Sequence, residues 1–77
     1  MRIYVASKHS LGEFALHPVN VIEVCASGPS PFADAQSYAK DYTLDTDEPA
    51  YVYAVDVQFK GRYDIVKEVV YRSTPES

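Results

Sequence analysis

The chain has 77 residues, of which 47% are hydrophobic and 23% charged, a balance that predicts one folded domain and excludes a disordered chain. Its single cysteine excludes an internal disulfide bond and a cysteine-rich zinc site. The formal net charge is −4, and residues 13–56 contain eight acids but one base, so the composition argues against a general DNA- or RNA-binding protein.

The first third of the chain predicts two strands with an ambiguous segment between them. Residues 2–6, RIYVA, alternate between two sides and predict a first strand. Residues 19–27, VNVIEVCAS, are rich in β-branched side chains and predict another strand. Gly12 and Pro18 interrupt residues 7–18, which fit either a short strand or a loop whose apolar side chains cap the core.

The apolar period then changes to that of an α-helix. Ser30 is a favourable N-cap, and Pro31 suits the first helical position, where its missing N–H is no loss. Apolar side chains recur at three- and four-residue spacings and form one stripe, which consists of Phe32, Ala35, Ala39 and Tyr42. We expect this stripe to pack on a sheet and the helix to end near Tyr42 or Thr43.

Residues 50–72, AYVYAVDVQFKGRYDIVKEVVYR, alternate so regularly that they predict a β-hairpin. One face carries the larger apolar side chains, and we expect it to lie beneath the helix. The two rows of that face meet if the following pairs form: Phe59 with Tyr63, Val57 with Ile65, Val55 with Lys67, Tyr53 with Val69, and Tyr51 with Tyr71. This register requires a three-residue loop, 60–62, in which the central position of Gly61 indicates a bulge near the turn.

The other face of the hairpin also carries apolar side chains, namely Val52, Ala54, Val66 and Val70. Because one helix covers only one side of a sheet, we expect these side chains to be exposed. Two interpretations stay open: another molecule covers them, or they are the scattered valines that many sheets expose.

Together these elements predict an α+β fold, in which an antiparallel sheet of three to five strands has one helix packed on one face. The order of the strands in the sheet is left open. We expect residues 1–72 to form a single α+β domain and residues 73–77 to form a flexible tail.

The residues that most often carry chemistry form no recognisable catalytic or metal-binding pattern. Cys25 lies in a predicted strand without a base beside it, so we interpret it as a buried core residue. His9 and His17 lack cysteine partners at ligand spacing and are expected on the surface. The acids of residues 45–48, DTDE, lack the glycine and the distant glutamate of a calcium loop. We therefore expect no enzyme activity, no metal and no cofactor.

The order strand, connection, strand, helix, strand, strand in an acidic chain of this size resembles small phage-encoded anti-CRISPR proteins. The resemblance implies a non-enzymatic inhibitor that binds a type I CRISPR surveillance complex and blocks its basic nucleic-acid-binding surface. An acidic region suits such a basic partner. The residues expected to bind this partner are Asp41, Tyr42, Asp45, Asp47 and Glu48.

A second hypothesis from another class is a self-associating structural or regulatory module, a homodimer formed through Val52, Val66 and Val70. The start of the chain lacks the apolar core of a signal peptide, and no run of residues is long enough to cross a bilayer. We expect a cytoplasmic protein that contacts neither a membrane nor nucleic acid directly; the resemblance would place it in the host cytoplasm.

Overall fold

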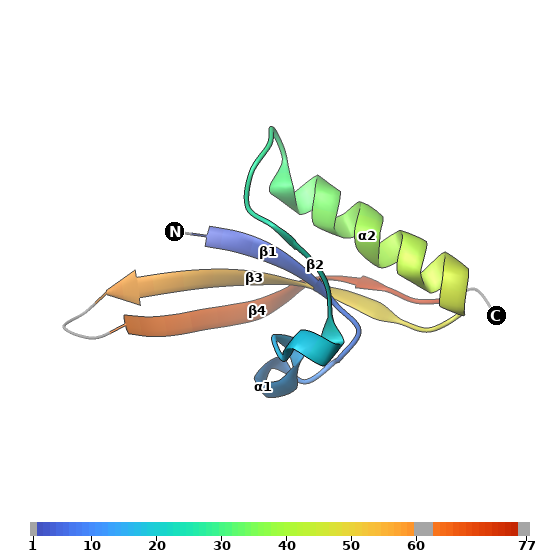
Figure 1. The fold of residues 1–77 in the computed structure, drawn as a ribbon, viewed down its shortest axis with the longest axis horizontal. Helices are drawn as coiled ribbons and strands as arrows, with labels where there is room; N and C mark the ends of the chain where they lie inside the picture. Colours follow the sequence, from blue (N-terminus) through green and yellow to red (C-terminus); the bar gives the residue numbers. More distant parts are fainter. Residues whose placement is uncertain (1, 60–62, 76–77) are drawn as a thin grey trace.

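The computed structural model describes residues 2–59 and 63–75; side chains are described within these ranges except at Gly12, 57–59 and 63–67. Four strands form one antiparallel sheet in the order β2-β1-β3-β4, with the long helix α2 on one face (Figure 1). The predicted α+β class is confirmed. The elements in chain order are β1 (Arg2–Ser7), α1 (Gly12–Ala15), a 3₁₀-helix (Pro18–Asn20), β2 (Val21–Cys25), α2 (Pro31–Thr46), β3 (Ala50–Phe59) and β4 (Tyr63–Ser73).

The β3–β4 hairpin has most of the expected register. Four of the predicted pairs are present: Phe59 with Tyr63, Val57 with Ile65, Val55 with Lys67, and Tyr53 with Val69. The fifth is wrong, because a bulge between Val52 and Tyr53 shifts the pairing so that Val52 lies opposite Tyr71. The bulge was expected at the turn instead, and the predicted loop at 60–62 lies outside the described residues.

The helix packs on the opposite face of the hairpin from the one expected. Ala35 and Ala39 of α2 form a buried cluster with Ala50 and Val52 of β3 and with Cys25 of β2. The small alanine side chains let the helix backbone approach a part of the sheet that is itself built of small residues. The larger apolar side chains of β3, among them Tyr51 and Tyr53, form what we call the aromatic row. The prediction that this row lies beneath the helix is therefore wrong.

The aromatic row lies on the other face, which the segment between β1 and β2 covers. Tyr53 packs there with Val5 and with Ala15 of α1, and its hydroxyl donates a hydrogen bond to the His9 carbonyl oxygen at 2.8 Å. In Figure 1, α1 and α2 lie on opposite sides of the sheet. Residues 7–18 were expected to be a strand or a core-capping loop. The segment does cap the core, but it does so with a short helix.

Both faces of the sheet are therefore covered near its centre, and the expected open face does not exist there. Val52 is completely buried and Ala54 is buried, while Val70 is 37% exposed. The side chain of Val66 lies outside the described residues. A homodimer through Val52, Val66 and Val70 is contradicted at Val52, which would be available only if α2 left the sheet.

The helix α2 begins as predicted and ends one turn later than predicted. The Ser30 hydroxyl accepts a hydrogen bond from the Ala33 N–H at 3.4 Å, and Pro31 is the first helical residue. The helix continues past Thr43, which is buried and whose hydroxyl donates to the Ser73 carbonyl oxygen at 3.4 Å. Asp47 then ends the helix in the left-handed conformation, with φ of 58°.

The C-terminal strand reaches one residue into the segment that was expected to be a flexible tail. Ser73 is the last residue of β4, pairs with Ala50 and is buried. Among the described residues, no helix is both long and apolar enough to cross a membrane.

Candidate partner-binding surface

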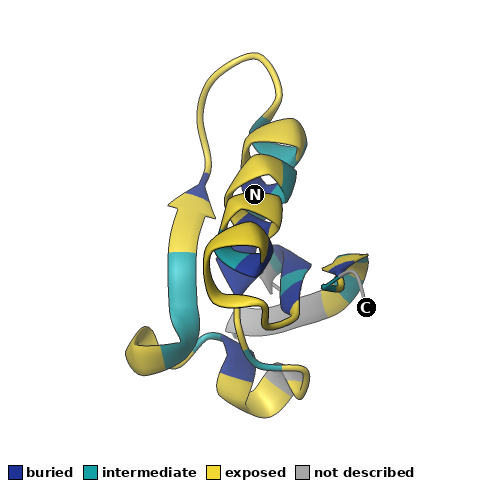
Figure 2. Ribbon diagram, turned by 90° about the vertical axis from the view of Figure 1, so that its right-hand side faces the viewer, coloured by how far each residue is buried: buried dark blue, intermediate teal, exposed yellow. Residues whose placement is uncertain are grey.

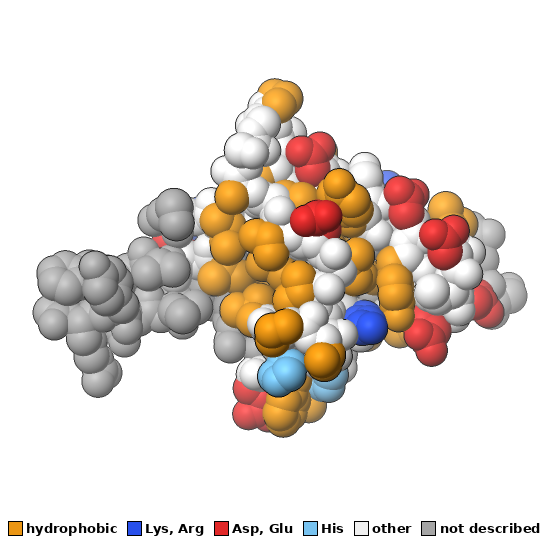
Figure 3. All heavy atoms as spheres, in the orientation of Figure 1, with side chains coloured by type: hydrophobic (Ala, Val, Ile, Leu, Met, Phe, Trp, Pro, Cys, Tyr) orange, Lys and Arg blue, Asp and Glu red, His pale blue; other side chains and the backbone are white. Residues whose placement is uncertain are grey.

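Three carboxylates lie on one exposed side of α2. Asp41 follows Asp34 by about two helical turns and Asp45 follows Asp34 by about three, so the three side chains project from the same side of the helix. All three residues are exposed, and Figure 3 shows acidic side chains along this helix. The buried residues of α2 lie on the side that faces the sheet (Figure 2). The outer side of α2 thus carries a row of negative charge.

Two more acids lie at the C-terminal end of α2. The Asp47 N–H donates to the Thr43 carbonyl oxygen at 2.8 Å, and the helix ends at Thr46, directly before Asp47. The Tyr42 hydroxyl donates to the Glu48 carboxylate at 3.1 Å, and this contact holds Glu48 beside the last turn. Asp47 and Glu48 are both exposed. We call the set Asp34, Asp41, Asp45, Asp47 and Glu48 the acidic surface.

The structure brings the predicted partner-binding residues together, with a different role for Tyr42. Asp41, Asp45, Asp47 and Glu48 are exposed at the C-terminal half and end of α2. Tyr42 is only half-exposed, because its ring packs against the core beneath α2. Burial and the hydrogen bond to Glu48 raise the pKa of the Tyr42 hydroxyl. Tyr42 therefore positions Glu48 and does not present a free aromatic anchor.

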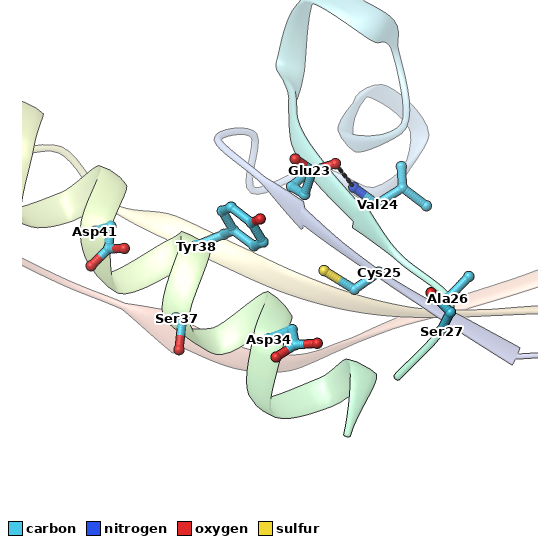
Figure 4. A pocket seen from close by; sticks show the side chains of 9 residues that line it. All are labelled: Glu23, Val24, Cys25, Ala26, Ser27, Asp34, Ser37, Tyr38 and Asp41. Carbon is cyan, nitrogen blue, oxygen red and sulfur yellow. Dashed lines mark hydrogen bonds between the residues drawn. The ribbon is translucent and has the colours of Figure 1, made fainter. Parts of the chain in front are cut away.

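A groove of about 600 Å³ lies between α2 and the edge strand β2. Figure 4 shows the Tyr38 ring and the Cys25 thiol pointing into this groove. Among the described residues its lining includes three carboxylates, of Glu23, Asp34 and Asp41, and no lysine or arginine. The groove extends the acidic surface from the outer side of α2 to the edge of the sheet.

Sequence reasoning missed this groove. One wall of the groove is formed by β2 and the other by α2, and these are separate elements of the sequence. The two walls meet because β2 is the edge strand of the sheet and lies beside α2. No spacing within one element connects Glu23 to Tyr38. The available signal was the acid in the middle of an apolar strand, since a charge there marks either an edge strand or an exposed face.

The Cys25 thiol at the floor of the groove is not poised for nucleophilic chemistry. Cys25 is buried, as expected. Burial, and secondarily the negative charges of Asp34 and Glu23, raise the pKa of this thiol above its ordinary value. A thiol whose pKa is raised carries little of the reactive thiolate at neutral pH.

Both histidines form hydrogen bonds with residues two or three positions further along the chain. His9 accepts a hydrogen bond from the Leu11 N–H on Nδ1 at 3.1 Å, and its ring contacts the ring of Phe14 at a centroid distance of 5.3 Å. His17 is exposed, and its carbonyl oxygen accepts from the Asn20 N–H at 2.8 Å. In the described ranges no three His, Cys, Asp or Glu side chains are grouped as metal ligands.

A second groove, of about 490 Å³, lies on the β4 side of α2 and has a different charge. Lys40 and Arg72 line it together with Asp47. The Lys40 ammonium lies 5.8 Å from the centre of the Tyr71 ring, within the range of a cation–π contact. The two sides of α2 thus differ: the β2 side is acidic, and the β4 side carries both signs.

Comparisons with known proteins identify no relative. No family model matches the sequence, no curated protein matches it, and no solved structure matches the fold.

Proposed function

We propose that this protein is a small, non-enzymatic cytoplasmic inhibitor that binds a host nucleoprotein complex and blocks its basic nucleic-acid-binding surface. The resemblance in size, element order and charge makes a type I CRISPR surveillance complex the target class. The contact is made by the acidic surface, with Asp41 and Asp45 at its centre. No nucleic acid is bound directly, since phosphates would be repelled by this surface.

The observation that carries the proposal is the common side of Asp34, Asp41 and Asp45 on α2. Scattered acids keep a small protein soluble and need no partner. Acids that repeat at whole helical turns form a row instead, and a row of negative charge matches a surface lined with lysine and arginine. Beyond the helix, Glu48 is held by the Tyr42 hydroxyl and adds a further carboxylate, while Asp47 lies on the side of Lys40 and Arg72.

The arrangement also accounts for inhibition without catalysis. A rigid helix that occupies lysine and arginine side chains removes them from the phosphates they would otherwise neutralise. Such an inhibitor acts by occupancy, at a ratio of one protein to each blocked surface. Its binding should weaken as ionic strength rises, because the contributing charges are exposed.

The first test measures DNA binding by a purified type I surveillance complex, followed by fluorescence anisotropy of labelled target DNA, as the protein is added. We expect the parent protein to prevent DNA binding and the double variant Asp41→Asn with Asp45→Asn to require about tenfold more protein, because two central charges are lost. Asparagine preserves the size of the side chain, so the variant changes charge and little else.

The matched control is the double variant Glu13→Gln with Glu68→Gln, which removes the same charge from exposed residues outside the acidic surface. It should inhibit like the parent. Equal inhibition by the parent and the Asp41/Asp45 variant, or no effect of the parent on DNA binding at low ionic strength, would contradict the proposal.

A further inference from the structure

The strand β2 forms one edge of the sheet, and its outer side is open. It spans Val21–Cys25 and pairs with β1 on its inner side; in the described part of the chain no strand lies on its outer side. The sheet order therefore leaves backbone donors and acceptors of β2 available for another extended chain. Open edges of this kind are templates for strand addition.

The backbone of Val24 shows how this edge is now satisfied. Its N–H donates to the carboxylate of the adjacent Glu23 at 3.2 Å (Figure 4), so it points away from the β1 ladder. The contact is local, exposed and joins neighbouring residues, so an incoming carbonyl oxygen can replace the carboxylate with little disturbance. Glu23 both occupies the edge and supplies a negative charge beside it.

The two faces that flank this edge differ in chemistry. The Glu23 side chain lies on the face that α2 covers, since Glu23 pairs with Ala6 and lines the groove with Asp34 and Asp41. Val24 pairs with Val5 and lies on the opposite face, where it is 49% exposed. A strand added at this edge would place alternate side chains against carboxylates on one face and against an exposed valine on the other.

We propose that the outer edge of β2 binds an extended segment of the partner as a fifth strand, in which lysine or arginine alternates with apolar residues. The basic side chains enter the groove toward Glu23, Asp34 and Asp41, and the apolar side chains pack beside Val24. The inference rests on the proposed function, and it specifies the kind of partner segment that the acidic surface recognises.

Charge selects this occupant over a second copy of the chain. Pairing of β2 with β2 of another molecule would bring the carboxylates of both grooves to one seam, and each molecule carries a net charge of −4. Like charges at such a contact oppose association. A basic strand neutralises the same carboxylates.

The test uses a fluorescent, terminally blocked seven-residue peptide of alternating lysine and valine, titrated with the full chain. A control peptide has the same four lysines and three valines in the order Lys-Lys-Val-Val-Val-Lys-Lys, which keeps the charge and removes the alternation. We expect the alternating peptide to bind at least about tenfold more tightly than the control. In nuclear magnetic resonance spectra, hydrogen exchange of the Val24 amide should slow when the alternating peptide is added.

The variant Val24→Pro removes the outward N–H without removing a donor from the β1 ladder, and proline is tolerated at such edge positions. We expect it to bind the alternating peptide at least about tenfold more weakly than the parent. Its fold is checked by circular dichroism. If the variant is not folded, the exchange rate of the Val24 amide in the parent protein decides the question alone.

The results separate this inference from the proposed function. Loss of peptide binding in Val24→Pro together with slowed Val24 exchange supports the fifth strand. If Val24→Pro binds the peptide like the parent, or the Val24 amide exchanges at the same rate with and without peptide, the fifth strand is overturned. The proposed function then still stands if Asp41→Asn with Asp45→Asn weakens inhibition. A dimer that Val24→Pro dissociates, detected by light scattering, would show that a second copy occupies the edge and would also overturn the inference.

Discussion

At the scale of single residues, Ser7 has a larger structural role than its position in the sequence indicates. It is completely buried at the end of β1. Its hydroxyl lies 2.8 Å from the Ala15 carbonyl oxygen and 3.1 Å from the Asn20 carbonyl oxygen, and it accepts from the His9 N–H at 3.3 Å. One side chain thus fixes the start, middle and end of the segment that covers the aromatic face.

Replacing Ser7 with alanine should lower the free energy of unfolding by about 1–3 kcal/mol, because the carbonyl oxygen of buried Ala15 loses its hydrogen bond from this hydroxyl; the Asn20 carbonyl oxygen keeps its bond from the Lys8 N–H. Urea unfolding followed by circular dichroism measures this change. The control Ser37→Ala alters an exposed serine of α2 and should change stability by less than about 0.5 kcal/mol. A Ser7→Ala variant as stable as that control would show that the hydroxyl does not hold the segment.

At the scale of elements, the alanine stripe of α2 determines which face of the sheet the helix covers. Ala35 and Ala39 are completely buried against Ala50 and Val52. The Phe32 ring contacts the Tyr4 ring at a centroid distance of 5.3 Å, so the larger apolar contact lies at the start of the helix. Alternation along the hairpin showed two apolar faces. The size of the side chains decides which face α2 covers, because the alanines of the helix pack closely only against a face that also carries small side chains.

The stripe also predicts a difference between two alanines of the same helix. Ala39→Leu should lower the free energy of unfolding by about 1–3 kcal/mol, because a leucine at this close contact forces α2 away from the sheet. Ala33 is exposed, so Ala33→Leu should have almost no effect. Urea unfolding of both variants tests this. Equal effects would mean that α2 does not pack closely at Ala39.

At the scale of the whole molecule, the sheet has a layer on each face, and each layer shields a tyrosine. Tyr42 belongs to the layer formed by α2, and Tyr53 lies beneath the segment between β1 and β2. Burial is the largest cause of the raised pKa of both hydroxyls, and it also raises the pKa of the Cys25 thiol. The folded state therefore holds these protons more tightly than the unfolded state does.

This proton linkage predicts loss of stability at alkaline pH. The raised pKa values of Tyr42 and Tyr53 contribute stability that is complete below the ordinary tyrosine pKa of 10.0 and is lost as pH rises through the higher folded-state values. Urea unfolding should give a smaller free energy at about pH 10.5 than at about pH 8. The Tyr53→Phe variant should show a weaker pH dependence than the parent. An identical pH dependence in the two proteins would exclude Tyr53 as a contributor.

The acidic surface is a whole-molecule feature that was only partly predictable. Asp41, Asp45, Asp47 and Glu48 were predicted from local charge density along the chain. Asp41 and Asp45 share one side of α2 because the helix continues to Thr46, about one turn past its predicted end. Glu23 and the groove depend on the order of the strands, to which no local pattern is sensitive.

The sequence by itself determined the α+β class, the start of α2 at Ser30 and Pro31, and the pairing of β3 with β4 from Phe59–Tyr63 to Tyr53–Val69. These features depend on period, capping and neighbouring residues, which act over a few positions of the chain. Only the tertiary structure decided which face α2 covers, where the bulge lies and that β2 is an open edge. Those features depend on how side chains from distant segments share one volume, and alternation along a strand is the same whichever face is covered.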